Sequence, residues 1–263
     1  MHAAVDEELS YLSGDWRIFQ KRRGHRWSLD DLVTAHFAVR ACRDAGLVPS
    51  LCVDLGCGIG SVLLMLAWSF PNARAVGVEA QAVSVGLAKK SIAYNGVGHR
   101  VEVREGDLRT TALPSAALVT GTPPYFPLGT AVVPDRPQAA GALFELRGGP
   151  EDYVCAAADL LEPQGLWVLC ASALQEERVF ASLRSHAFHV AQFQRVVPRH
   201  GKAPLLGLWA ARKERCDTQV LPPLVVRDAT GQWTEEFSWV RADMGLPPRA
   251  PSATRPNSKG ATP

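Results

Sequence analysis

The stretch that most limits the fold of this chain is Val53-Asp54-Leu55-Gly56-Cys57-Gly58-Ile59-Gly60, where a short apolar run passes directly into three alternating glycines. This pattern predicts a buried strand that turns sharply into an apolar helix over residues 61–70. Glycine lets the backbone turn tightly and approach a ligand that a Cβ atom would push away. The spacing differs from the GxGxxG fingerprint of dinucleotide sites because position 61 is serine. We therefore expect Gly56, Gly58 and Gly60 to shape a nucleotide-type cofactor site at a strand end.

Strand-like and helical runs alternate through the middle of the chain, which predicts βαβ units and a parallel sheet. The predicted strands lie at 51–55, 75–79, 100–104, 116–120 and 166–171, and the predicted helices at 61–70, 81–95, 151–161 and 174–185. Two longer strands, 189–197 and 205–212, are expected to form an antiparallel hairpin. The fold class is therefore α/β: a Rossmann-like, seven-stranded sheet, mostly parallel, with an antiparallel C-terminal hairpin.

The chain divides into three predicted segments. Residues 1–48 are expected to form a hairpin over Trp16–Trp27 and a helix, both packed on a catalytic domain that spans 49–247. Ser28 and Asp31 have the spacing of a weak capping box at the start of that helix. Residues 248–263 are rich in Pro, Ser, Ala, Asn and Gly, a composition that predicts a disordered tail.

The composition indicates a soluble protein with a sizeable core. Of the 263 residues, 47% are apolar, and the net charge of +2 is too small to indicate a nucleic-acid partner by itself. The six cysteines form neither a CxxC pair nor a zinc-type His/Cys spacing, so we expect no metal and free thiols in a reducing compartment. Five of them lie in apolar segments and are expected to be buried: Cys42, Cys52, Cys57, Cys155 and Cys170.

Neither the start of the chain nor its apolar runs suggest a membrane protein. Acidic residues at 6–8 stand where a signal peptide would need an apolar run, and the longest apolar stretch, 62–68, is too short to span a bilayer. We expect a cytoplasmic protein with no membrane partner.

Three acids follow successive predicted strands, where a cofactor of an α/β sheet would bind. Asp54 suits the ammonium or sulfonium side of a methionine moiety better than it suits a pyrophosphate. Glu79 ends the second strand, a common place for an acid that holds both ribose hydroxyls. Asp107 follows the third strand and is expected to accept from an adenine amino group. These acids and the glycines together predict S-adenosyl-L-methionine as the cofactor.

The segment Thr122-Pro123-Pro124-Tyr125-Phe126 follows the fourth predicted strand and has the form of a clamp for a planar amino group. Such a nitrogen is a poor nucleophile because its lone pair is delocalised. Acceptors that hold its N–H bonds, here Thr122 and the Pro123 carbonyl, free the lone pair, while the Tyr125 ring stacks on the plane. We therefore predict Thr122, Pro123, Pro124 and Tyr125 as the catalytic set.

With these motifs the chain resembles the bacterial valine-tRNA adenine-N6 methyltransferase family, whose NPPY-type motif matches residues 122–125. The likeness extends over about Trp16 to Gly245, and its further matches are Phe19-Gln20-Lys21, Gly24 to Asp30, Glu79 to Lys89, Glu105 to Leu108, Pro198 to Pro204 and Asp228 to Phe237. Thr122 stands where the family has asparagine, and residues 142–145 lack the basic and histidine residues expected in that loop. The resemblance implies an S-adenosylmethionine-dependent enzyme that methylates N6 of an adenine in tRNA or another structured RNA.

Basic residues in two turns are expected to hold the RNA backbone. They are Lys21, Arg22, Arg23 and Arg26 near the start of the chain and Arg199 and Lys202 in the late turn. Two alternatives stay open: methylation of a glutamine side-chain amide in a protein, which the same clamp can hold, and a cofactor-binding scaffold with weak or no activity. A monomer or weak dimer is expected, with a partner subunit left open.

Overall fold

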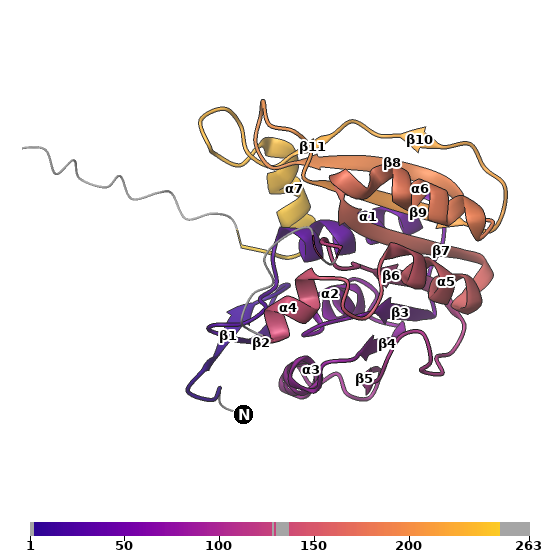
Figure 1. Ribbon diagram of the computed structural model, residues 1–263. Helices are drawn as coiled ribbons and strands as arrows, with labels where there is room; N and C mark the ends of the chain where they lie inside the picture. The colour runs from indigo at the N-terminus through magenta and orange to yellow at the C-terminus, as the bar shows by residue number, and fades with distance from the viewer. Residues whose placement is uncertain (1–2, 128, 130–136, 248–263) are drawn as a thin grey trace, which may run out of the picture.

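A nine-stranded, mostly parallel sheet runs through the molecule, with helices on both of its faces (Figure 1). The computed structural model describes residues 3–127, 129 and 137–247. The strand order is β10-β8-β9-β7-β6-β3-β4-β5, and β11 also pairs with β8. The strands are β3 (Leu51–Leu55), β4 (Arg74–Glu79), β5 (Val101–Glu105), β6 (Ala116–Gly121), β7 (Leu161–Ser172), β8 (His189–Val197), β9 (Leu206–Arg212), β10 (Gln219–Val220) and β11 (Leu224–Val225).

The expected mostly parallel α/β sheet is confirmed. Strands β7, β6, β3, β4 and β5 pair in parallel, whereas β9 runs antiparallel to both β7 and β8. All of the parallel strands therefore end at one edge of the sheet, which is where ligands bind in open α/β folds. The two edge strands β10 and β11 are additions that the sequence did not predict.

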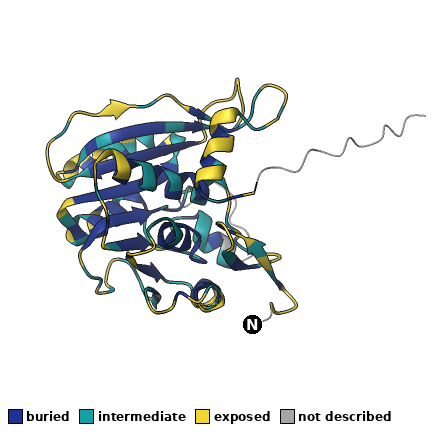
Figure 2. Cartoon of the chain, turned by 180° about the vertical axis from the view of Figure 1, so that it is seen from behind, coloured by how far each residue is buried: buried dark blue, intermediate teal, exposed yellow. Residues whose placement is uncertain are grey.

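The helices cover the two faces of the sheet and create two separate apolar cores. They are α1 (Leu29–Asp44), α2 (Ser61–Ser69), α3 (Ala82–Tyr94), α4 (Pro137–Leu143), α5 (Pro150–Leu160), α6 (Glu176–Ser185) and α7 (Glu235–Asp243). Side chains of α1, α2 and α3 share one core, and those of α5 and α6 share the other. Figure 2 shows the strands between them as almost continuously buried. Alternate residues of β3 point to opposite cores, Cys52 to the first and Val53 to the second.

The N-terminal hairpin is formed by residues other than those predicted. Strand β1 (Glu7–Tyr11) pairs antiparallel with β2 (Arg17–Lys21), and Glu7 lies opposite Lys21. The tight turn is therefore at residues 12–16, and Arg22 to Gly24 lie beyond the hairpin instead of at its tip. This register is fixed because it buries Ile18 and Phe19 completely.

Helix α1 begins as the sequence predicts. The Ser28 amide donates to Asp31 Oδ2 at 2.7 Å, which is the capping box expected from their spacing. Helix α1 then lies against α2, β7 and β9. Helix α1 thus packs directly on the sheet, and the expected tail at 248–263 lies outside the described residues.

Two local predictions are wrong. Strand β7 begins at Leu161 instead of residue 166, because α5 ends at Leu160 and the chain continues extended through Pro163. Cys155 lies on the exposed side of α5, whereas the other four cysteines expected in the core are buried. Within the described part of the chain, no helix has the length and apolar character needed to cross a membrane.

Candidate active site

A cavity of about 370 Å³ opens at the carboxyl ends of β3, β4, β6 and β7. Four parts of the chain supply much of its lining: the start of α1, the glycine turn after β3, the end of β4 and the loop after β6. These contribute Asp30, Asp31, Asp54, Gly56, Gly58, Ser61, Glu79, Gln81, Thr122, Pro123, Pro124 and Tyr125. Both predicted motifs therefore face one cavity, of a size usual for small-molecule sites.

The glycine turn has the left-handed backbone that only glycine adopts without strain. Gly56, Gly58 and Gly60 have φ values of +62°, +55° and +84°. Gly56 and Gly58 line the cavity, but Gly60 does not. A Cβ atom on Gly60 would lie 3.2 Å from Ala88 Cβ, so this glycine allows α3 to approach the start of α2. Gly60, which the sequence placed at the cofactor, therefore lies in a contact between two helices.

Glu79, the last residue of the neighbouring strand β4, bonds to the glycine turn. Its two carboxylate oxygens accept from the Gly58 amide at 3.0 Å and from the Gln81 amide at 2.7 Å. Burial raises the pKa of Glu79, while these amide bonds act in the opposite direction. The carboxylate thus joins the end of β4, the turn after β3 and the start of α3, which holds the turn in shape.

Asp54 and Asp31 are two further buried carboxyls on the cavity wall. Asp54 accepts from Thr120 Oγ1 at 2.7 Å, and burial raises its pKa to about 7. Asp31 accepts from Ser61 Oγ at 2.5 Å, and burial, reinforced by the charge of Asp30, raises its pKa to about 8. The sequence indicated Asp31 only as a helix cap.

Among the described residues, the hydrogen-bond partners of Asp31, Asp54 and Glu79 are all neutral hydroxyl or amide groups. Arg26 also lines the cavity, but its guanidinium is paired with Glu8. A buried carboxylate is stabilised by a positive charge at close range. A ligand that carries ammonium and sulfonium groups therefore fits this wall.

Asp107 lies beside the main cavity. It lines a smaller cavity that shares Gly56, Glu79 and Pro124 with the larger one. Both of its carboxylate oxygens accept from the Arg109 guanidinium, which lowers the pKa of Asp107. Its place next to the turn agrees with the prediction, but in this structure the carboxylate is already paired with an arginine.

The loop after β6 brings the predicted clamp into the cavity. Thr122 Oγ1 is buried and has no hydrogen-bond partner within the part of the chain that the structure describes. Leaving a buried hydroxyl unpaired costs about 1–3 kcal/mol, so this atom suits a ligand that donates to it. Tyr125 lines the same cavity, and its hydroxyl donates to Asp30 Oδ2 at 2.5 Å.

The comparisons with known proteins agree with this geometry. Residues 52–122 match a family model described as "Methyltransferase domain". A tRNA1(Val) (adenine(37)-N6)-methyltransferase of Porphyromonas gingivalis is 29% identical over 202 residues, which are 73% of this chain and 78% of that protein. A release factor glutamine methyltransferase of Synechocystis sp. is 29% identical over 171 residues, covering 57% of this chain and 56% of that one.

The matched family model spans the glycine turn, all three predicted cofactor-side acids and the start of the clamp. The chain is an S-adenosylmethionine-dependent methyltransferase. The resemblance to the valine-tRNA adenine-N6 methyltransferases is confirmed. A crystal structure of a predicted O-methyltransferase from Agrobacterium tumefaciens shares the fold, with a TM-score of 0.63 at 19% identity, covering 84% of this chain and 99% of that one.

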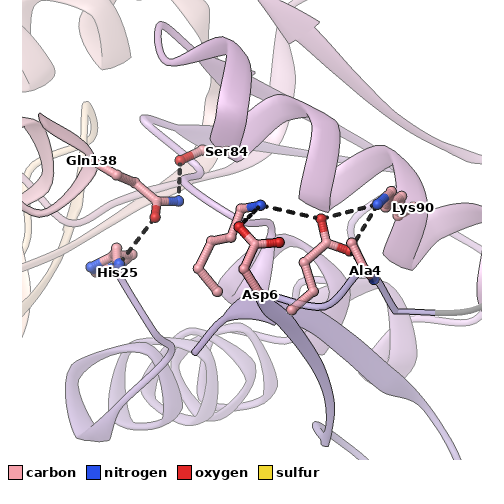
Figure 3. Close-up of polar contacts among 8 residues, drawn as sticks. Ala4, Asp6, His25, Ser84, Lys90 and Gln138 are labelled. Atoms are coloured by element: carbon pink, nitrogen blue, oxygen red, sulfur yellow. Dashed lines mark hydrogen bonds and ion pairs between the residues drawn. The ribbon is translucent and has the colours of Figure 1, made fainter. Parts of the chain in front are cut away.

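His25 also lines the methyltransferase cavity, a place that the sequence did not indicate. Its backbone amide donates to Gln138 Oε1, and Gln138 Nε2 donates to Ser84 Oγ, so that the segment before α1 is joined to α4 and α3 (Figure 3). Burial lowers the pKa of His25. The imidazole therefore adds no positive charge to the cavity at neutral pH.

The six predicted RNA-binding residues of the methyltransferase are not equally available. Lys21 pairs with Asp6 at 2.7 Å and also reaches Glu7, and Arg26 pairs with Glu8 at 2.5 Å. These acidic partners reduce the positive charge offered to a phosphate. Arg22 and Arg23, in contrast, are exposed.

The late basic turn lies between β8 and β9, next to the cavity lining at Leu205 and Leu206. Arg199 donates to the Ala229 carbonyl at 2.5 Å, and Lys202 is exposed. Of the six residues, Arg26 lines the cavity itself. Among the described residues, no group of three or more His, Cys, Asp or Glu side chains is arranged to hold a metal ion.

Proposed function

We propose that the protein methylates the N6 amino group of an adenine in structured RNA, with tRNA as the expected substrate. The observation that carries the proposal is the unpaired hydroxyl of Thr122, buried in the same cavity as Asp54 and Glu79. An exocyclic amino group supplies the donor that this oxygen lacks. The relative from Porphyromonas gingivalis, named for adenine-N6 methylation of a tRNA, supports the choice of base.

The residues of this chain divide the work of such a reaction. Asp54, Gly56, Gly58 and Glu79 would hold the cofactor, with Asp107 beside them, and the cofactor supplies the methyl group on a sulfonium centre when bound. Thr122 Oγ1 and the Pro123 carbonyl accept the two N–H bonds of the amino group. Held in this way, the nitrogen loses conjugation with the ring and its lone pair becomes available, while Tyr125 supports the base.

We also propose Arg22, Arg23, Arg199 and Lys202 as the phosphate contacts, with Lys21 and Arg26 in a smaller role because of their ion pairs. The catalytic unit in this proposal is 49–247, completed by the hairpin and helix of 1–48, and it acts in the cytoplasm as a monomer or weak dimer.

The test is mass spectrometry of nucleosides from RNA incubated with the protein and methyl-labelled S-adenosylmethionine. Labelled N6-methyladenosine is the expected product. The Thr122→Val variant keeps the shape but removes the acceptor, so its rate should fall by about tenfold to hundredfold. Thr122→Asn supplies an amide acceptor and should preserve or raise the rate. Robust wild-type turnover that Thr122→Asn abolishes would contradict the assignment of adenine.

Methylation of a glutamine amide is the second candidate, favoured by the Synechocystis relative named as a glutamine methyltransferase. A carboxamide has the same planar N–H geometry as an adenine amino group. Label found in protein from a cell extract, with none in RNA, would support this candidate and refute the first.

A further inference from the structure

The hydroxyl of Tyr125 is bound to an aspartate that lies 95 residues earlier in the chain. It donates to Asp30 Oδ2 at 2.5 Å, and the other oxygen of Asp30 accepts from Ser28 Oγ. Both Asp30 and Tyr125 line the active cavity. The clamp loop after β6 is thereby joined to the first turn of α1.

That first turn is itself held in place from several sides. Asp31 accepts from the Ser28 amide at 2.7 Å and from Ser61 Oγ of α2 at 2.5 Å. Thr34 Oγ1 donates to the Asp30 carbonyl at 2.6 Å. Asp30 therefore presents its carboxylate from a fixed helical turn, which is the kind of support that holds a site side chain in one geometry.

The hydroxyl stays a donor under ordinary conditions. Burial, together with Cys170 and the nearby acids Asp30 and Asp31, raises the pKa of Tyr125 well above its usual value. The ring also packs against the core on the α1 side of the sheet. A phenol donating to a carboxylate is among the stronger hydrogen bonds in proteins.

We propose that Asp30 is a positioning residue, which sets the orientation of the Tyr125 ring against the target base through the tyrosine hydroxyl. The inference rests on the proposed function, since it concerns the same clamp. In this arrangement the hydroxyl of Tyr125 bonds to the protein, and its ring contacts the substrate. A phenylalanine ring would stack on the base equally well, but it lacks the hydroxyl that bonds to Asp30. Tyrosine is therefore required at this position.

Kinetics of four variants test the pair. Asp30→Ala and Tyr125→Phe should each lower kcat by about tenfold, with the KM for S-adenosylmethionine unchanged. Asp30→Asn keeps an acceptor and should retain most of the wild-type rate. In the Tyr125→Phe background, Asp30→Ala should cause no further loss, because the bond is already absent. Asp15→Ala, at an exposed position before the hairpin's second strand, is the matched control and should behave as wild type.

An equal loss from Asp30→Ala in both backgrounds would overturn the proposal, because the aspartate would then act without the hydroxyl. A loss in Asp30→Asn as large as that in Asp30→Ala would overturn it too.

A second measurement needs no substrate. The chain has four tyrosines, so 3-fluorotyrosine labelling gives four ¹⁹F resonances, and the Tyr125→Phe spectrum assigns one of them. Asp30→Ala should shift the Tyr125 resonance more than the other three, and Asp15→Ala should leave it in place. An unchanged Tyr125 resonance would refute the pair. A shifted resonance in a protein that methylates no RNA would leave the pair standing and refute the proposed function instead.

Discussion

The two walls of the cavity differ in how far their polar groups already have partners within the protein. On the proposed cofactor side, the carboxylate oxygens of Glu79 are both used by backbone amides, and Asp54 is bonded to Thr120. On the proposed substrate side, Thr122 Oγ1 is buried without a partner in the described chain. The first wall is therefore preorganised before any ligand arrives, whereas the second is completed by its ligand. Variants on the two walls should fail in different ways.

The largest expected effect is on the substrate side. Tyr125→Ala removes both the stacking surface and the bond to Asp30, so turnover should fall by about hundredfold or more. Calorimetric binding of S-adenosylmethionine should stay as in wild type. The control is Tyr11→Ala, which removes a half-exposed ring far from Tyr125 in the sequence. Loss of cofactor binding in Tyr125→Ala would show that the two walls are not separable.

Glu79→Ala should show the opposite behaviour. It removes a buried carboxylate that holds the glycine turn, and cofactor binding should weaken by about 1–3 kcal/mol. The control is Glu105→Ala. Glu105 is exposed and lies opposite Glu79 on the neighbouring strand β5, and its loss should leave binding unchanged. Calorimetry measures both. Unchanged affinity in Glu79→Ala would remove the basis for assigning this wall to the cofactor.

Charge reversal at Arg22 and Arg23 should act on RNA alone. We expect RNA affinity to fall by several-fold to about tenfold at moderate salt, with a flatter dependence on salt concentration, because fewer phosphates are neutralised. Arg184→Glu, on the exposed end of α6, is the control. Filter binding across a salt series gives both quantities. If slope and affinity stay constant, these arginines do not contact RNA.

The smallest expected effect is a pH dependence of stability in the absence of cofactor. The pKa values of Asp31 and Asp54 are raised from 3.8 to about 8 and about 7, so the folded protein binds protons that the unfolded chain releases. The stabilisation is complete below about pH 4 and is lost as the pH rises through 7 to 8. Between pH 5.5 and 8.5 the Tm should fall by a few degrees.

Asp31→Asn should flatten this slope, because the amide is neutral at every pH. Asp15→Asn, an exposed position, should retain the wild-type slope. A Tm that rises between pH 5.5 and 8.5 in the wild-type protein would mean that these carboxyls are ionised in the folded state.

The sequence predicted the strand and the glycine turn of the proposed cofactor wall well because their signals are local. The apolar run and glycines of 51–60 set the strand and the turn without reference to distant residues, and β3 was placed at its exact residues, Leu51–Leu55. The capping box at the start of α1 was equally local. The role of Asp30 was missed because its partner Tyr125 is 95 residues away and only the folded sheet brings them together.

The N-terminal hairpin was misplaced for a related reason. Its register depends on burying Phe19 against α3, where the Phe19 amide donates to Ser91 Oγ and the Arg17 amide donates to Asn95 Oδ1. The basic run at 21–24 has the composition of a hairpin turn. The sequence alone did not show the contacts with α3 that place the turn at residues 12–16 instead. The packing of Gly60 against Ala88 was also not predicted, since Ala88 belongs to a helix that follows it in the chain.

The packing of α1 on β7 and β9 has a consequence for synthesis of the protein. Helix α1 leaves the ribosome early, yet the strands that cover it are complete only after Arg212 has been added. Gln192 Nε2 and Asp44 Oδ2, for example, meet across 148 residues of sequence. Until then the apolar face of α1 stays exposed to water, and contacts of such separation slow folding. The nascent chain thus has a long interval in which the face of α1 that packs on β7 and β9 is a target for chaperones.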